Sequence, residues 1–128
     1  MSVMTTIALT ASLFNIPRAE LAAILQVESA TCKFKVNKAS SARGCGQILK
    51  GTAKHYGFDF KLMHDNEYSI IATGFILAQL RRRTADYICA YNQGLTGARK
   101  FKHTLCKEYK NLVNNAKIHN QRRIYAKR

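Results

Sequence analysis

The sequence has few acidic residues: seven Asp and Glu stand against 21 Lys and Arg, a formal charge of +14 over 128 residues. This imbalance predicts an anionic partner, such as nucleic acid, a bacterial envelope or an acidic lipid surface, without choosing among them. No run comes near the roughly 20 apolar residues that a membrane span requires, so we expect a soluble chain. Repeats and low-complexity linkers are also absent, and 47% hydrophobic content fits one compact domain over residues 1–128.

The N-terminus lacks the features of an export signal. Residues 1–14 are apolar, but they show neither a basic start nor a clear cleavage site made of small residues. We therefore expect an ordinary first helix in this segment, and synthesis in the cytosol without a signal peptide.

The cysteines Cys32, Cys45, Cys89 and Cys106 lack the spacing of a zinc site, because no Cys-x-x-Cys pair occurs and no histidine lies at ligand spacing. No metal or cofactor is implied. Cys89 lies in an apolar stretch and is interpreted as a small core residue, and free thiols are the expectation for all four. A disulfide between Cys32 and Cys106 is the less favoured alternative, since the chain lacks an export signal.

Gly, Pro and Asn divide the chain into mostly helical segments. Pro17 suits the first turn of a helix, Gly57 can end one, and Asp65 can cap the next. The pattern predicts helices over residues 5–14, 17–29, 47–56, 66–83, 84–93 and 97–116. The helix over 66–83 is apolar around most of its circumference, which predicts a central, buried position. Residues 30–46 are rich in small and polar types, which indicates a long loop or a short β-ribbon.

The last predicted helix has one apolar face and one basic face. Phe101, Leu105, Tyr109, Leu112 and Ala116 are spaced to lie together on the apolar side. The basic side and the tail from about residue 97 support one functional hypothesis, a small helical nucleic-acid-binding module whose binding would weaken with salt. No helix-turn-helix, zinc or base-stacking signature accompanies the charge, so nucleic acid is the less favoured partner.

One glutamate occupies a position where a helix would ordinarily place a core residue. Glu28 follows Ile24 by four residues and Leu21 by seven, so its carboxylate lies on the apolar face of the predicted helix. Burial raises the pKa of a carboxyl group, which can then hold a proton near neutral pH and deliver it to a substrate. Glu28 is therefore a candidate general acid, whereas Glu20, earlier in the same helix, is expected to be solvated at the surface.

Three short motifs follow one another along the chain: Glu28-Ser29, then Gly-Cys-Gly-Gln over residues 44–47, then Ala-Tyr-Asn-Gln-Gly over residues 90–94. They resemble the Glu-Ser, Gly-Leu-Met-Gln and Ala-Tyr-Asn-x-Gly motifs of the lytic transglycosylase and goose-type lysozyme superfamily, over about residues 16–101. The resemblance implies a mainly all-α, lysozyme-like single domain. Its substrate groove would lie between a small lobe around residues 30–46 and the helical bundle.

The resemblance also implies a reaction, cleavage of the β-1,4 bond between N-acetylmuramic acid and N-acetylglucosamine in peptidoglycan. Glu28 matches the family's single catalytic carboxylate, which acts as acid and then as base while the muramic acid 6-hydroxyl closes a 1,6-anhydro ring. Most glycosidases need two carboxylates, but a substrate that supplies its own nucleophile can manage with one. A hydrolytic muramidase of the same fold is the alternative. The lack of a second acid in any motif argues modestly for the transglycosylase.

Three further motif residues match positions that contact the substrate or the catalytic acid. Tyr91 matches a tyrosine whose hydroxyl bonds and orients the catalytic carboxylate. Gln47 and Asn92 match amides that line the sugar subsites, where a group that both donates and accepts hydrogen bonds suits acetamido and hydroxyl groups.

The remaining matches concern the loop and the end of the active-site helix. Ser29 resembles a serine that supports this helix end. Gly44 and Gly46 would let the loop pass close to the saccharide, since they have no side chain to obstruct it. Ser41 is the candidate for the serine that holds the substrate's N-acetyl group.

The resemblance also predicts partners and location. We expect a monomer that binds peptidoglycan glycan strands, with anionic polymers of the cell envelope as further partners for its basic surface. Synthesis without an export signal fits a phage protein that is packaged in the virion, or released to the wall through another factor.

Overall fold

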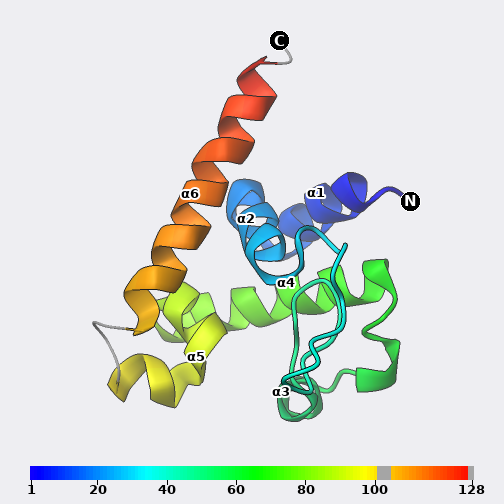
Figure 1. Ribbon diagram of the computed structural model, residues 1–128, viewed down its shortest axis with the longest axis vertical. Coiled ribbons are helices and arrows are strands. Elements are labelled where there is room, and N and C mark those ends of the chain that lie inside the picture. Colours follow the sequence, from blue (N-terminus) through cyan, green and yellow to red (C-terminus); the bar gives the residue numbers. More distant parts are fainter. Residues whose placement is uncertain (101–104, 127–128) are drawn as a thin grey trace.

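A computed structural model describes residues 1–100 and 105–126 (Figure 1). Within these ranges the chain forms α1 (Val3–Phe14), α2 (Arg18–Ser29), α3 (Lys50–Tyr56), a 3₁₀ turn η1 (Phe60–Leu62), α4 (Asn66–Arg83), α5 (Tyr87–Lys100) and α6 (Leu105–Ala126). The β-structure of the described residues amounts to two isolated bridges, which pair Arg43 with Val36 and with Ile48. The all-α prediction is confirmed. No helix in the described ranges is long and apolar enough to cross a membrane.

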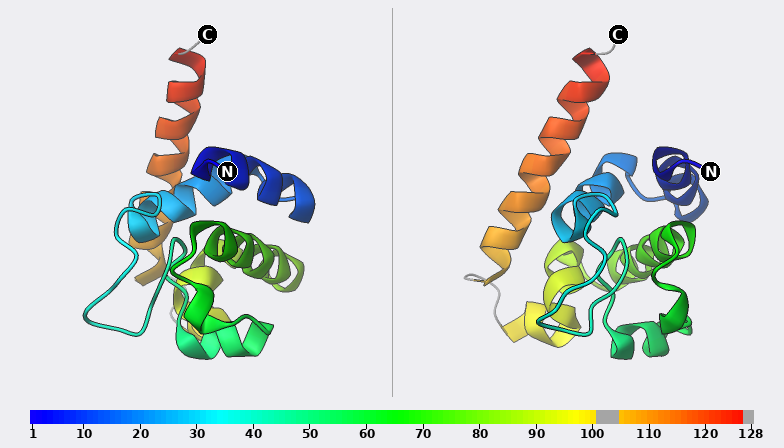
Figure 2. Two further views of the ribbon diagram at one scale, coloured as in Figure 1. Left: turned by 90° about the vertical axis from the view of Figure 1, so that its right-hand side faces the viewer. Right: turned by 45° about the vertical axis from the view of Figure 1, so that its right-hand side comes forward.

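Helix α4 forms the centre of the bundle, as its apolar pattern predicts (Figure 2). It packs against α1, α2 and α5, and Ile70, Leu77 and Leu80 are buried along it. At Gly74 an added Cβ atom would press on the methyl group of Thr10 in α1. The close approach of these two helices therefore requires a residue without a side chain at this position.

Most helix ends lie where their signals predict. The Asp65 side chain accepts a hydrogen bond from the backbone at the start of α4, Pro17 precedes α2, and Gly57 ends α3 with a φ of 80°. The third helix is shorter than predicted, because it begins at Lys50 rather than at Gln47. The backbone of Gln47 has a φ of 50°, a left-handed conformation that no α-helix contains.

Helix α6 lies antiparallel to α2 and extends beyond the body of the protein (Figure 1). It covers the face of α2 that carries both Glu20 and Glu28, which are eight residues apart. The prediction that Glu20 is solvated is therefore wrong. Glu20 is 6% exposed, with one carboxylate oxygen 3.7 Å from Nζ of Lys117 and the other without a hydrogen-bond partner among the described residues.

The residues that α6 buries differ in part from those of the predicted apolar face. Cys106, Tyr109 and Val113 are buried, whereas Leu112 is 55% exposed. Gly94, with φ 75° and ψ 166°, interrupts α5, so a second helical segment follows it up to residue 100, close to the predicted start at residue 97. The next described helix, α6, spans Leu105–Ala126 and so extends ten residues beyond the predicted end at residue 116. Phe101, which the prediction placed on the apolar face, lies outside the described residues.

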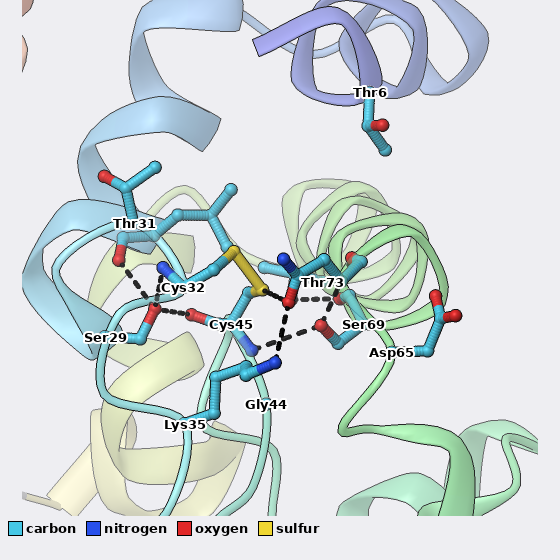
Figure 3. Close-up of a disulfide and its surroundings, with 12 residues drawn as sticks. Thr6, Ser29, Thr31, Cys32, Lys35, Gly44, Cys45, Asp65, Ser69 and Thr73 are labelled. Atoms are coloured by element: carbon cyan, nitrogen blue, oxygen red, sulfur yellow. Dashed lines mark hydrogen bonds between the residues drawn. A yellow bond between two sulfur atoms is a disulfide. The ribbon is translucent and has the colours of Figure 1, made fainter. Parts of the chain in front are cut away.

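Two disulfides join the four cysteines, so the prediction of free thiols is wrong. Cys32 is bonded to Cys45 (Figure 3) and Cys89 to Cys106, with Cα atoms 4.3 and 5.2 Å apart. The pairing of Cys32 with Cys106 does not occur. The pairs are 13 and 17 residues apart in the sequence, and a closed loop of about 15 residues stabilises a fold by about 3 kcal/mol. Sequence spacing did not reveal these pairs, because the path of the loop after α2 brings Cys32 and Cys45 together and the packing of α5 with α6 brings Cys89 and Cys106 together.

Candidate active site

Glu28 lies in the last turn of α2, half-buried in the wall of a surface cavity of about 300 Å³. Its Oε2 accepts a hydrogen bond of 2.7 Å from the hydroxyl of Tyr109. Burial raises the pKa of the Glu28 carboxyl above its usual value, and the bond from Tyr109 opposes that rise only in part. The carboxyl group therefore retains a proton to higher pH than a solvated glutamate does, which is the property of a general acid.

The tyrosine on Glu28 is not the one that the sequence motifs indicate. Tyr91 was expected to bond the carboxylate, but its hydroxyl donates to the backbone carbonyl of Gly46 at 2.6 Å. The bond to Glu28 comes instead from Tyr109 in α6, 81 residues away in the sequence. The sequence placed Tyr109 only on the apolar face of the last helix, and a tyrosine rather than an aliphatic residue there was the single available signal.

Both tyrosines are held in their neutral form. Burial raises the pKa of each hydroxyl, and the nearby charge of Glu28 raises it further. Each hydroxyl therefore remains a hydrogen-bond donor over the whole range in which a carboxyl group titrates. Tyr109 can stabilise the ionised form of Glu28, while Tyr91 fixes the loop at Gly46.

The cavity beside Glu28, called here the Glu28 groove, has a mixed polar and apolar wall. Its lining comes from α2, the 30–49 loop, α3, α4 and α5: Glu28, Asn37, Ser40, Ala42, Gln47, Ile48, Leu49, Thr52, Ile76, Tyr91 and Asn92. Glu28 is the only carboxylate in this wall among the described residues. Amides and hydroxyls beside a single acid suit a ligand rich in hydroxyl and acetamido groups.

The predicted amides, Gln47 from the loop and Asn92 from α5, both line the Glu28 groove. Nε2 of Gln47 donates to the carbonyls of Lys35 at 3.1 Å and of Gly44 at 3.0 Å. Both amide hydrogens are thus used to hold the loop, so only the amide oxygen remains for a ligand. Asn92 is exposed in the groove wall; its amide oxygen accepts a hydrogen bond from Nε2 of Gln93, so its NH₂ group can donate to a ligand.

Ser29 is buried and connects the end of α2 to the loop (Figure 3). Its hydroxyl lies 2.6 Å from the carbonyl oxygen of Cys45, to which it donates, and it accepts a 2.8 Å bond from the backbone N–H of Cys32. Ser29 does not line the groove. These contacts hold the carboxyl-terminal end of the Glu28 helix against the chain that forms the groove wall.

The glycines of the second motif serve protein packing rather than access to a ligand, contrary to expectation. At Gly44, with a φ of 83°, an added Cβ would press on the carbonyl of Met63. At Gly46 it would press on Thr73 and on the hydroxyl of Tyr91. Neither glycine lines the groove. The small residues therefore let the loop lie close against α4 and α5.

The serine predicted to bind an acetamido group, Ser41, is exposed and outside the groove wall, whereas its neighbour Ser40 lines the groove. The guanidinium of Arg43 holds this part of the loop by donating to the carbonyls of Asn37, Ser40 and Ala42, at 3.3, 3.1 and 2.7 Å. In the part of the chain that the structure describes, no group of three or more His, Cys, Asp or Glu could hold a metal ion.

Comparisons with known proteins give one match. A family model described as the transglycosylase SLT domain matches residues 6–113. The matched range includes Glu28, the loop, Tyr91 and Tyr109, so it covers every part of the site. Comparisons with curated proteins and with solved structures returned no match.

Proposed function

Because the chain belongs to the transglycosylase SLT domain family, it is lysozyme-like and acts on the peptidoglycan of the bacterial cell wall, and we propose which reaction it performs there and how. The proposed reaction is lytic transglycosylation: cleavage of the β-1,4 bond between N-acetylmuramic acid and N-acetylglucosamine, with formation of 1,6-anhydro-N-acetylmuramic acid. The observation that supports it best is a single half-buried carboxyl group, Glu28, with a raised pKa in the wall of a groove that also contains amides and hydroxyls.

In the first step Glu28 protonates the oxygen of the glycosidic bond. Because Oε2 accepts the hydrogen bond from Tyr109, the transferable proton resides on Oε1. As the bond to C1 breaks, the proton moves to the leaving hydroxyl group and Glu28 becomes ionised. The bond from Tyr109 then stabilises the new charge, since a hydrogen bond to an ionised group is stronger than one to a neutral group.

In the second step the ionised Glu28 acts as a base. It takes the proton from the 6-hydroxyl of the muramic acid residue, whose oxygen attacks C1 and closes the anhydro ring. The substrate thus provides the nucleophile that a second carboxylate would otherwise provide or activate. This accounts for a groove wall with one acid, and it favours the transglycosylase over a muramidase, in which water would attack.

The remaining wall residues have binding roles in this proposal. The amide oxygen of Gln47, the Asn92 amide and the Ser40 hydroxyl would form hydrogen bonds with sugar hydroxyls and acetamido groups. Ser40 replaces Ser41 in this role, because Ser40 lines the groove. The formal charge of +14 would concentrate the enzyme on an anionic wall, which it would reach as part of a virion or through a release factor.

The test is mass spectrometry of the soluble products from purified peptidoglycan treated with the wild-type chain and with Glu28→Gln. This nearly isosteric change removes the transferable proton. Glu67→Gln is a matched control, because Glu67 is half exposed and paired with the N-terminal amine. We expect anhydro-muropeptides from the wild type and the control and none from Glu28→Gln. Reducing-end products, heavier by one water, would assign a muramidase, and no product from any variant would contradict an enzymatic role.

A further inference from the structure

The Cys32–Cys45 disulfide joins the helix of the proton donor to the wall of the Glu28 groove. Cys32 follows Glu28 by four residues, and Cys45 precedes Gln47 by two. The same two segments are bonded through the Ser29 hydroxyl (Figure 3). This disulfide therefore fixes the distance between the catalytic carboxyl group and the loop that carries the Gln47 amide.

The Cys89–Cys106 disulfide joins the segments that carry the half-buried Tyr91 and the buried Tyr109. Cys89 precedes Tyr91 by two residues in α5, and Cys106 precedes Tyr109 by three in α6. Both cysteines are fully buried. Tyr109 is less than one helical turn from Cys106, or about 4.5 Å along the axis. A displacement of the first turn of α6 would therefore move the Tyr109 hydroxyl away from Glu28.

Other contacts hold this first turn of α6 less firmly. Lys110 pairs with Asp86 at 2.7 Å, but both side chains are partly exposed, and ion pairs at a surface contribute little to stability. The buried Val113 and the Lys117 pair with Glu20 anchor α6 further along its length. The disulfide is thus the strongest described link between the first turn of α6 and the body.

We propose that the two disulfides position the catalytic groups, so that the wall-cutting activity requires all four cysteines in their oxidised form. This inference rests on the function proposed for Glu28. A misplacement of about 1 Å in an active site can lower a rate by about a hundredfold. The reduced chain would keep its helices but lose the hydrogen bond from Tyr109 and the close fit of the loop.

The bridges form by thiol–disulfide exchange with a disulfide-bonded small molecule or protein. One cysteine thiolate attacks a sulfur of the oxidant and releases its first thiol, and the partner cysteine thiolate then displaces the second. The two cysteines lose two electrons and two protons, which leave as the two thiols of the oxidant. A chain made in a reducing cytosol would hold thiols and be inactive. It would become active in the oxidising compartment where the wall lies.

The test compares the full chain refolded with tris(2-carboxyethyl)phosphine and the same chain refolded with reduced and oxidised glutathione. Circular dichroism measures helix content, and release of soluble muropeptides measures the rate as a function of pH. We expect equal helix content and a rate about a hundredfold lower for the reduced chain. Its activity should also persist to higher pH, because the bond that lowers the pKa of Glu28 is lost. Reoxidation should restore both properties.

Paired variants separate the two bridges. Removing the second bridge, with Cys89→Ser and Cys106→Ser together, should move the alkaline limb of the pH–rate profile to higher pH. Adding the same two substitutions to Tyr109→Phe should leave the limb where Tyr109→Phe alone puts it. Cys32→Ser with Cys45→Ser should raise KM and leave the limb in place, because Tyr109 still reaches Glu28.

Three results would overturn the inference. In the first, a reduced chain with native helix content has the rate and pH profile of the oxidised one. In the second, the chain unfolds when either bridge is removed, which would make the bridges general stabilisers of the fold rather than positioning links. In the third, the oxidised chain itself is inactive, which would refute the proposed function and, with it, this dependence on oxidation.

Discussion

The hydrogen bond from Tyr109 to Glu28 gives a direct test of the proposed general acid. Tyr109→Phe keeps the aromatic ring in its buried position and removes only the hydroxyl that lies 2.7 Å from Oε2. That bond lowers the pKa of Glu28 and so opposes the effect of burial. Its removal therefore raises the pKa further, and the protonated, active form of Glu28 should persist to higher pH in the variant.

The size of the shift follows from the strength of such a bond. A hydrogen bond to a charged group contributes about 1.5–3 kcal/mol, and one pKa unit corresponds to about 1.4 kcal/mol. Because part of the bond to Glu28 survives when the carboxyl group is protonated, we expect the alkaline limb to move up by about one unit. The rate on the acidic plateau should fall about tenfold, since the carboxyl group is no longer oriented.

The assay is the initial rate of muropeptide release at a series of pH values. Tyr68→Phe is a matched control, because the Tyr68 hydroxyl accepts a bond from the backbone of Asp59, and Tyr68 does not line the Glu28 groove. This control should leave the alkaline limb unchanged. A limb that stays in place in Tyr109→Phe, or moves to lower pH, would refute the assignment of Glu28 as the acid whose pKa Tyr109 sets.

Three further predictions concern stability. Because the pKa of Glu28 is raised in the fold, the wild type loses stability as pH rises from the unfolded value toward the folded one. The melting temperature of Glu28→Gln should thus exceed that of the wild type at pH 8 but not at pH 4. The same difference in melting temperature at both pH values would refute the raised pKa of Glu28. Gly46→Ala should lower the free energy of unfolding, measured by urea denaturation, by about 1–3 kcal/mol, because the added methyl group presses on Thr73. An unchanged urea midpoint would contradict the close packing of Gly46 against α4. Lys117→Met leaves Glu20 without its ion pair, and because Lys117 is partly exposed and the pair is 3.7 Å long, the loss should lower the unfolding free energy by about 1 kcal/mol. Adding Glu20→Met should restore the melting temperature, and a melting temperature that stays low would refute the role of this pair.

Local signals in the sequence predicted the elements whose causes are local. Asp65 caps α4 and Gly57 ends α3 because a side-chain oxygen or a left-handed backbone is enough to end a helix. The apolar spacing that predicted a carboxylate on the inner face of α2 placed Glu28 correctly. Glu20 lies on the same side of α2, and its burial was missed because the sequence does not show that α6 covers this side.

Features made by distant segments were not predictable in this way. The Tyr109 bond depends on α6 lying antiparallel to α2, and nothing near residue 109 encodes that packing. The two disulfides were missed for the same reason. Gly44 was expected to lie beside the ligand because the sequence shows its motif but not its spatial contact with Met63. The motifs thus indicated which residues lie at or near the site, but the contacts that determine the role of each residue come from tertiary packing.

The 81-residue separation between Glu28 and Tyr109 has a consequence for biosynthesis. A nascent chain can form α1 to α4 around their own core while α6 is still inside the ribosome. Glu28, the proposed proton donor, is then present without the helix that carries Tyr109. The proposed site is therefore complete only once α6 has left the ribosome, and fragments that end before α6 would be folded in part but would lack the Tyr109 hydroxyl that bonds Glu28.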